Sequence, residues 1–514
     1  MRAARHWIDA PALTVFCLAA LSPFSTAAGH ELRIEHVTIV SPERSAPMRD
    51  ASIRIEDDRI TAIVQGGLPA QRSAQTEIID GRGLYVVPGL IDSHVHTFAL
   101  PGIGDPQERA REDVATAVRN QIPHSYLFFG YTTLIDLIST PEHVAAWNAL
   151  EIRPDLYFCG GAQIPGGYPP IKYLSEKDRG VLYAYMIVQR GEEGKAPEGV
   201  DPATHTPEAV VARMKHDGAI CVKTFYERGF GEVDELPVPR LDTIRDLVKA
   251  AHAVHLPVLI HANGTDAQEF AVQAGADISA HGMWHWNREQ DHTDLTPRAQ
   301  AILDSVIAAK MGWQPTMQVL YGLQDLFDPE YLSDPEFAHV VPAVAIEWYR
   351  SAPGQWFRDV LAQEITSKAV QDSHDPQAQF AAVRAELAAP ITRNKNATHY
   401  MATHGGRILF GTDTPSAPTY ANPPGLNGWR EMQHLVDAGM TPLQIFRAAT
   451  QTNAASLGLA REIGTVESGK RANLLLLRAD PTQTLQAYNE IVKVILRGKV
   501  LDREELAADR AAKP

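Results

Sequence analysis

Short apolar runs alternate with helix-length segments through the middle of the chain. Helical periodicity is clearest at Leu241–Val254, Ala267–Ala274, Arg298–Lys310 and Pro442–Leu457. The apolar runs lie near Gly89–His94, Thr132–Leu137, Leu156–Cys159, Ala219–Phe225, Pro257–His261, Ile278–His281, Gly312–Pro315 and Ile408–Thr412. This alternation is typical of βα units with a parallel sheet, and eight strands close a (β/α)8 barrel. The pattern therefore predicts an α/β fold with a TIM barrel over residues 88–459.

Strand-like alternation also marks both ends of the chain. These strands lie near residues 32–40, 51–56, 59–64, 76–80, 464–466, 472–477 and 491–496. So few short strands at either end would make a stable core only if they were joined. We therefore expect one small β-sandwich domain, formed by residues 29–87 and 460–505 together.

Two insertions interrupt the regular βα spacing. Residues 163–205 are rich in glycine and proline, and residues 317–403 are long, mostly helical in pattern and rich in aromatic side chains. Both follow predicted strands, so in a barrel they lie on the C-terminal face, where active sites are found. A lid or pocket wall and a surface elaboration or oligomer contact remain equal alternatives for them.

The composition is that of an ordinary globular protein, with 45% hydrophobic and 21% charged residues. The formal net charge of −15 argues against nucleic acid and against a stable association with anionic membranes. A small molecule remains as the expected partner, and a homo-oligomer is left open.

The first 28 residues have the pattern of a secretory signal peptide. Arg2 and Arg5 are followed by an apolar stretch from Ala10 to Leu21 and by small residues at Thr26-Ala27-Ala28. We therefore expect a bacterial protein that is secreted or periplasmic after cleavage.

With Cys17 inside this segment, Cys159 and Cys221 are the two remaining cysteines. They can lie on neighbouring strands, so one bridge is conceivable. Two residues are too few for a disulfide scaffold, and we expect two buried thiols.

Candidate metal ligands stand at the ends of the predicted barrel strands. His94 and His96 share one face of the first strand, since alternate strand residues project the same way. Lys223 lies near the end of an apolar strand, where a lysine is rarely buried unless paired or modified. His261 and His281 end the fifth and sixth strands, and Asp413 follows the eighth. Imidazole and carboxylate groups that converge in this way are typical of a divalent-metal site.

This ordered set resembles the amidohydrolase superfamily. The flanking segments agree with it: Val87-Pro88-Gly89-Leu90-Ile91-Asp92 and Gly469-Lys470-Arg471-Ala472-Asn473-Leu474. Within the superfamily the chain is most similar to the imidazolonepropionase-like branch, which includes metal-dependent prolidases and related dipeptide and N-acyl-amino-acid hydrolases. The insertion after the seventh strand departs from that pattern.

The resemblance implies two divalent ions, for which zinc fits best. One would be held by His94, His96 and Asp413, and the other by His261 and His281, with carbamylated Lys223 as the bridge. A metal-bridging hydroxide would attack an amide carbonyl, with Asp413 as the proton shuttle. The alternatives are a mononuclear deaminase or a cyclic-amide or lactone hydrolase of the same superfamily, and a non-catalytic ligand-binding scaffold. The deaminase pattern needs a glutamate shortly after His261, and none stands before Glu269.

Three further residues near strand ends are candidates for binding a substrate carboxylate. Tyr226 and Arg228 follow Lys223, and His285 follows His281. An arginine can bind a carboxylate through two parallel hydrogen bonds. The equal alternative is that Arg228 pairs with Glu227 or Glu232 in solvent.

Overall fold

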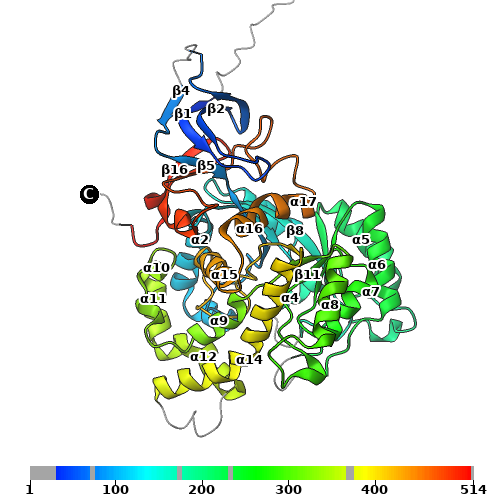
Figure 1. Cartoon of the computed structure of the whole chain (residues 1–514). Helices are drawn as coiled ribbons and strands as arrows, with labels where there is room; N and C mark the ends of the chain where they lie inside the picture. The colour runs from blue at the N-terminus through cyan, green and yellow to red at the C-terminus, as the bar shows by residue number, and fades with distance from the viewer. Residues whose placement is uncertain (1–29, 70–75, 171–175, 230–234, 366–374, 511–514) are drawn as a thin grey trace, which may run out of the picture.

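The computed structural model describes residues 30–69, 76–170, 176–229, 235–365 and 375–510. The predicted signal peptide lies outside these ranges. Figure 1 shows a sheet in which the two ends of the chain, blue and red, lie side by side, next to a larger part that is rich in helices. No helix among the described residues is long and apolar enough to cross a membrane.

The larger part is built on a curled sheet of eight parallel strands. In chain order these are β6 (Leu90–Val95), β7 (Tyr131–Asp136), β8 (Asp155–Ala162), β9 (Cys221–Phe225), β10 (Val258–His261), β11 (Ile278–Ala280), β12 (Gly312–Gln314) and β13 (Arg407–Ile408). Each strand pairs with the next one along the chain. The predicted TIM-like barrel is confirmed.

Backbone hydrogen bonds between β6 and the segment after β13 close the barrel. Ser93 N–H donates to Phe410 O over 3.2 Å, and Asp413 N–H donates to His94 O over 2.7 Å. Gly411 permits this approach, because a Cβ there would lie 2.8 Å from the Cβ of His94. The closure therefore brings the first and last candidate ligands together.

Helices cover the outside of the barrel. They are α2 (Glu112–Phe128), α3 (Pro141–Asn148), α5 (Pro207–His216), α6 (Leu241–Ala253), α7 (Thr265–Ala274), α8 (Pro297–Ala308), α15 (Leu426–Asp437), α16 (Pro442–Arg447) and α17 (Asn453–Ser456). In α6 the buried residues include Ile244, Leu247, Val248 and Ala251, which is the helical spacing that packs one face inward. The predicted helix from Pro442 to Leu457 is interrupted by a π-helical turn over residues 448–452.

The two chain ends form one mixed sheet. Its strands are β1 (Glu31–Ile39), β2 (Met48–Glu56), β3 (Arg59–Gln65), β4 (Thr76–Asp80), β5 (Tyr85–Pro88), β14 (Leu474–Leu477), β15 (Ile491–Leu496) and β16 (Lys499–Asp502). The join is between β5 and β14, which pair antiparallel. A separate mixed sheet composed of both chain ends is thus confirmed, and the strands predicted to form a sandwich lie in one hydrogen-bonded sheet.

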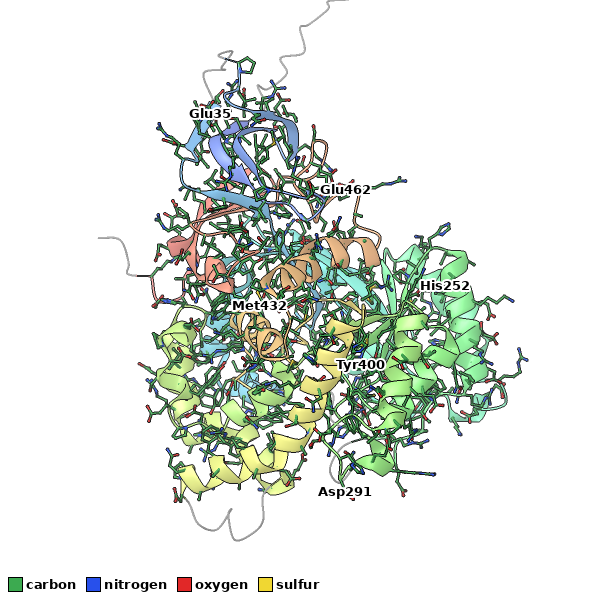
Figure 2. The ribbon with its side chains drawn as sticks, in the orientation of Figure 1. Glu35, His252, Asp291, Tyr400, Met432 and Glu462 are labelled. Carbon is green, nitrogen blue, oxygen red and sulfur yellow. A yellow bond between two sulfur atoms is a disulfide. The ribbon has the colours of Figure 1, made fainter. Side chains whose placement is uncertain are left out.

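Ion pairs hold segments from distant parts of the chain together around this sheet. Asp155, at the start of β8, accepts hydrogen bonds from Arg471 over 2.8 Å and from Arg497 over 2.9 Å. Glu462, labelled in Figure 2 near the base of the sheet, accepts one from Arg59 over 2.6 Å.

The long insertion is helical, as its pattern predicts. It contains α9 (Gln318–Asp325), α10 (Pro335–Ala338), α11 (Ala343–Arg350), α12 (Trp356–Ile365) and α14 (Pro376–Thr403). In Figure 1 α12 and the start of α14 lie at the lower end of the molecule, away from the small sheet, whereas α11 lies above them on the left. The shorter insertion contains α4 (Glu176–Ala184), and α1 (Asp105–Ala110) follows β6.

The expectation of two buried thiols is wrong, because Cys159 and Cys221 form a disulfide. They face each other in the register of β8 and β9, and their Cα atoms are 4.5 Å apart, within the range that a disulfide spans. Strand register decides the pairing, and the sequence pattern alone does not supply register. Both residues are fully buried in the apolar interior of the barrel, with Ile91, Ile135 and Leu259.

Candidate metal centre

One cavity collects all six predicted ligands. Its volume is about 1310 Å³, and its lining includes the side chains of His94, His96, Lys223, His261, His281 and Asp413. Lys223 is the middle residue of β9, and the other five lie near or beyond the carboxyl ends of their barrel strands. Since parallel strands end at the same face, residues far apart in the sequence converge there.

His94, His96 and Asp413 form the tightest group. The Nε2 atoms of both histidines lie 3.0 Å from Oδ1 of Asp413. Hydrogen bonds between the backbones fix this arrangement, because His96 N–H donates to Thr414 O over 2.8 Å and Asp413 N–H donates to His94 O.

His281 completes a compact three-residue group with His94 and Asp413. One potential ligand atom from each of the three lies within 4.8 Å of the other two, and all three residues are buried. Nδ1 of His281 is 3.9 Å from Oδ2 of Asp413 and 3.0 Å from the hydroxyl of Thr316. The ring of His281 also lies between the rings of His94 and His261, at centroid distances of 4.9 and 4.4 Å.

Glu227 is a neighbour of His261 that the sequence analysis did not assign to the site. Its carboxylate oxygen lies 3.3 Å from Nε2 of His261, and its side chain is buried. Its second oxygen accepts the N–H of Gly229 over 2.9 Å. A carboxylate on one imidazole nitrogen orients the ring so that the other nitrogen can bind an ion. The only sequence signal for this role is its position four residues after Lys223.

Lys223 is 1% exposed, deep in the same cavity. Burial lowers the pKa of its ammonium to about 7, although the charge of Asp413 acts in the opposite direction. Its Nζ lies 5.7 Å from the centre of the Phe225 ring. A fraction of this lysine is therefore a neutral amine near neutral pH, which is the form that reacts with CO₂.

The electrostatics of the cavity suit a bound cation. Burial lowers the pKa of His94 to about 3 and that of His281 well below its ordinary value, so both imidazoles are neutral. Burial raises the pKa of Asp413, but its interactions with His94, His96 and His281 outweigh this and leave it well below its usual range. Neutral imidazoles and an ionised carboxylate are the protonation states that bind divalent metals. The residues present therefore fit the metal that the resemblance implies.

Both insertions contribute to the cavity wall. Tyr168 lies against His261 with ring centroids 4.6 Å apart, and Leu182 of α4 also lines the cavity. From the long insertion, Trp356 faces the same space. These contacts agree with a pocket wall, and not with a mere surface elaboration, as the role of the insertions.

The three predicted carboxylate-binding residues lie apart from the cavity lining. Tyr226 packs on Phe270 with ring centroids 4.5 Å apart, and Arg228 is exposed beside Tyr226. His285 is half-buried after β11. Their role in substrate binding stays a prediction without support from this geometry.

Comparison with known proteins agrees with the site. The model of the amidohydrolase family matches residues 85–294 and 362–501, which is more than half of the chain. The chain therefore belongs to the amidohydrolase family. The class that this family defines is hydrolases acting on carbon–nitrogen bonds, and the resemblance inferred from the ligand set is confirmed.

Solved structures share the fold over nearly the whole chain. A Xaa-Pro dipeptidase with bound methionine is 20% identical, with a TM-score of 0.62 over 92% of this chain and 100% of its own. Ochratoxinase from A. niger is 18% identical, with a TM-score of 0.61 over 94% of this chain and 99% of its own. Phenylurea hydrolase B is 19% identical, with a TM-score of 0.60 over 92% of this chain and 97% of its own.

Curated relatives match over short segments. Adenine deaminase of Paracoccus denitrificans is 35% identical over 88 residues, 16% of this chain and 14% of its own length. Imidazolonepropionase of Shouchella clausii is 40% identical over 65 residues, 12% of this chain and 14% of its own. The chain thus spans about a seventh of the length of these relatives.

Proposed function

We propose that this protein hydrolyses an amide bond in a dipeptide or an N-acyl amino acid, with two divalent ions, zinc in the first instance, as cofactors. The observation that carries the proposal is the convergence of four histidines, a lysine and an aspartate in one cavity. The prolidase-like fold of the neighbours supports the substrate class.

His94, His96 and Asp413 would hold one ion, and His261 and His281 the other. Bound ions of this kind supply a water of lowered pKa and polarise the scissile carbonyl. Glu227 would keep the ring of His261 in place by accepting a hydrogen bond from Nε2. Thr316 would do the same for His281 from its other side.

Lys223 would join the two positions as a carbamate. Its neutral Nζ attacks the carbon of CO₂, a nitrogen–carbon bond forms, and the nitrogen releases one proton, which leaves an anionic carboxylate. Without that modification, burial of the lysine would require its amine to remain uncharged, because burial disfavours the ammonium form.

Asp413 would move the proton during hydrolysis. Its Oδ1 faces His94 and His96, and its Oδ2 faces His281, so the carboxylate stands among all the proposed ion positions. It would take the proton of the attacking water and pass it to the leaving amine.

Export into an oxidising compartment forms part of the proposal. A disulfide in a mesophilic protein persists outside the reducing cytosol, and the Cys159–Cys221 bridge agrees with the secretory pattern of residues 1–28. Fractionation of cells that express the full chain tests this: the bridged protein is expected outside the cytoplasm, and retention inside with free thiols would contradict it.

The test of the activity is a hydrolysis screen. The purified protein, loaded with zinc, is incubated with pools of dipeptides and N-acyl amino acids, and released amino acid is measured. Release that stops after chelation and returns with metal supports the proposal. Release of ammonia from aminated heterocycles, without amino acid, would instead support the deaminase alternative.

A further inference from the structure

An apolar wall extends from the metal centre along one part of the cavity. It consists of Phe98, Leu100 and Ile103 from the segment after β6, and Trp356 from α12. The wall begins at the site itself, since the Phe98 ring lies 6.1 Å from the ring of His96. Whatever group binds along it is therefore adjacent to the reacting bond.

The long insertion fixes this wall in place. The indole N–H of Trp356 donates to Gly102 O over 3.1 Å, and the hydroxyl of Tyr349 donates to Pro101 O over 2.5 Å. The backbone also packs closely on the indole, because a Cβ on Gly104 would lie 3.3 Å from Cζ2 of Trp356. Leu100 and Ile103 are each 7% exposed. The wall is therefore a preformed surface.

The side chains that line the cavity determine which part of a substrate can bind against the apolar wall. Further apolar side chains come from Ile138, Val181 and Leu182. Apart from the metal centre, the charged lining residues in the described part of the chain all belong to α1 or to the first residue of α2, at Asp105, Glu108, Arg109 and Glu112. A carboxylate placed against the apolar wall would be desolvated, which is costly, and three of these four charged residues are acidic and would repel it. The half of the substrate that carries a carboxylate is therefore excluded from it.

The volume of the cavity also favours a ligand with a large apolar group. Pockets for small ligands usually have volumes of about 300–1,000 Å³, and this one has about 1310 Å³. A small dipeptide would leave much of the apolar wall in contact with water.

Building on the proposed function, we propose that the apolar wall binds a bulky apolar acyl group. The substrate is then an N-acyl amino acid whose acyl chain is larger than a natural side chain, and Trp356 determines the size that is accepted. Trp356 contacts the acyl group and takes no part in the chemistry.

A series of N-alkanoyl derivatives of L-alanine, from acetyl to octanoyl, tests this in the zinc-loaded protein. Affinity is measured by calorimetry and kcat/KM by release of alanine. Both are expected to rise by about fourfold per methylene while the chain extends along the wall. Trp356→Ala should lower the affinity for the octanoyl compound by about tenfold and that for the acetyl compound by a much smaller factor.

Two further variants control for folding. Trp356→Phe keeps an aromatic ring without the N–H and should retain most of the preference. Val360→Ala, at a 44% exposed position of the same helix, should behave as wild type. An affinity that stays flat along the series, or a preference that survives Trp356→Ala in the folded protein, overturns the inference.

The outcomes separate this inference from the function on which it rests. Equal turnover and equal affinity for short and long acyl groups would remove the apolar-wall assignment and leave the hydrolase proposal intact. Affinity that rises with chain length without any release of alanine would support the wall and refute the hydrolase.

Discussion

Two of the candidate ligands have an unusual backbone conformation. His281 has φ of +88° and Asp413 has φ of +59°, the left-handed region that residues other than glycine seldom adopt. Such residues cost about 1–3 kcal/mol each and persist where the surrounding structure enforces them. The closure of the barrel enforces the conformation of Asp413, through the hydrogen bond to His94 O.

Asp413→Asn tests the proton shuttle with little change in shape. Asparagine tolerates the left-handed region but does not accept the proton of water. We expect kcat to fall by about 10²-fold or more, while substrate affinity measured by calorimetry survives. If kcat is retained and KM rises, Asp413 contributes to binding and not to proton transfer.

Glu227→Gln tests whether this carboxylate orients the ring of His261. Removal of its charge weakens the orientation of His261, and we expect metal affinity to fall by about 10–100-fold. Competition with a chelator of known affinity measures this, with Glu208→Gln on the exposed face of α5 as the matched control. Unchanged metal affinity in Glu227→Gln, or an equal loss in the control, would contradict the assignment.

At the scale of single residues, the sequence predicted the ligands better than their neighbours. His94, His261 and His281 each end or follow an apolar strand, so the rule that parallel strands end at one face was enough. Glu227 and Tyr168 lie on segments without periodicity, and their contacts with His261 depend on how two loops pack. No sequence pattern encodes that packing.

At the scale of elements, the Cys159–Cys221 disulfide joins the neighbouring barrel strands β8 and β9, two residues before Lys223. It closes a loop of 62 residues, for which the chain-entropy model gives a stabilisation of about 4 kcal/mol. The double variant Cys159→Ala/Cys221→Ala should therefore unfold at lower urea concentration than wild type.

A reductant provides the control for that experiment. Once the urea has exposed the bridge, dithiothreitol should lower the unfolding midpoint of the wild type towards that of the double variant, and should leave the variant unchanged. Identical midpoints for oxidised wild type and the variant would show that the bridge does not stabilise the fold.

The number and order of the barrel strands were predictable because each is a buried apolar run followed by a helical segment. The least regular one is β13, with two residues, and closure there depends on the segment that follows it. Cys159 and Cys221 were misjudged because their pairing requires the register of β8 against β9, which hydrophobic patterns do not reveal.

At the scale of the whole molecule, Asp155 links the barrel to the C-terminal part of the small sheet. Burial raises the pKa of Asp155, but the hydrogen bond and charge of Arg471 and the charge of Arg497 outweigh this and lower it overall. A carboxylate with a lowered native pKa stabilises the fold above its unfolded pKa, about 3.9. That contribution to stability is lost as the pH falls through the pKa of Asp155 in the folded protein.

Asp155→Asn should therefore destabilise the protein at pH 7, by about 3–5 kcal/mol. Arg471, Arg497 and also Arg153, whose guanidinium donates to Oδ1 of Asp155 over 2.6 Å, would lose their shared carboxylate. The difference from wild type should shrink as the pH is lowered below about 4. Urea unfolding at pH 7 and at pH 3 measures both effects. Asp246→Asn on the exposed side of α6 is the control, and a difference that does not depend on pH would contradict the role of this charge.

The two insertions combine features that a sequence pattern encodes with contacts that it does not. Their lengths and helical character were evident, and their position after strands placed them on the face of the active site. That Trp356 reaches back to Gly102 could not be inferred, because it depends on contacts between residues about 250 positions apart.

The proposed two-ion centre depends on Lys223, so the number of metal ions bound per chain is the decisive measurement. Elemental analysis of the zinc-loaded wild type, after removal of free metal, should give two ions per chain. Lys223→Ala should lose most of this metal, and short carboxylic acids should restore part of it by replacing the bridge. The control Lys249→Ala, an exposed lysine on α6, should keep two. One ion or none in the wild type, or two ions retained in Lys223→Ala, would contradict the two-ion centre.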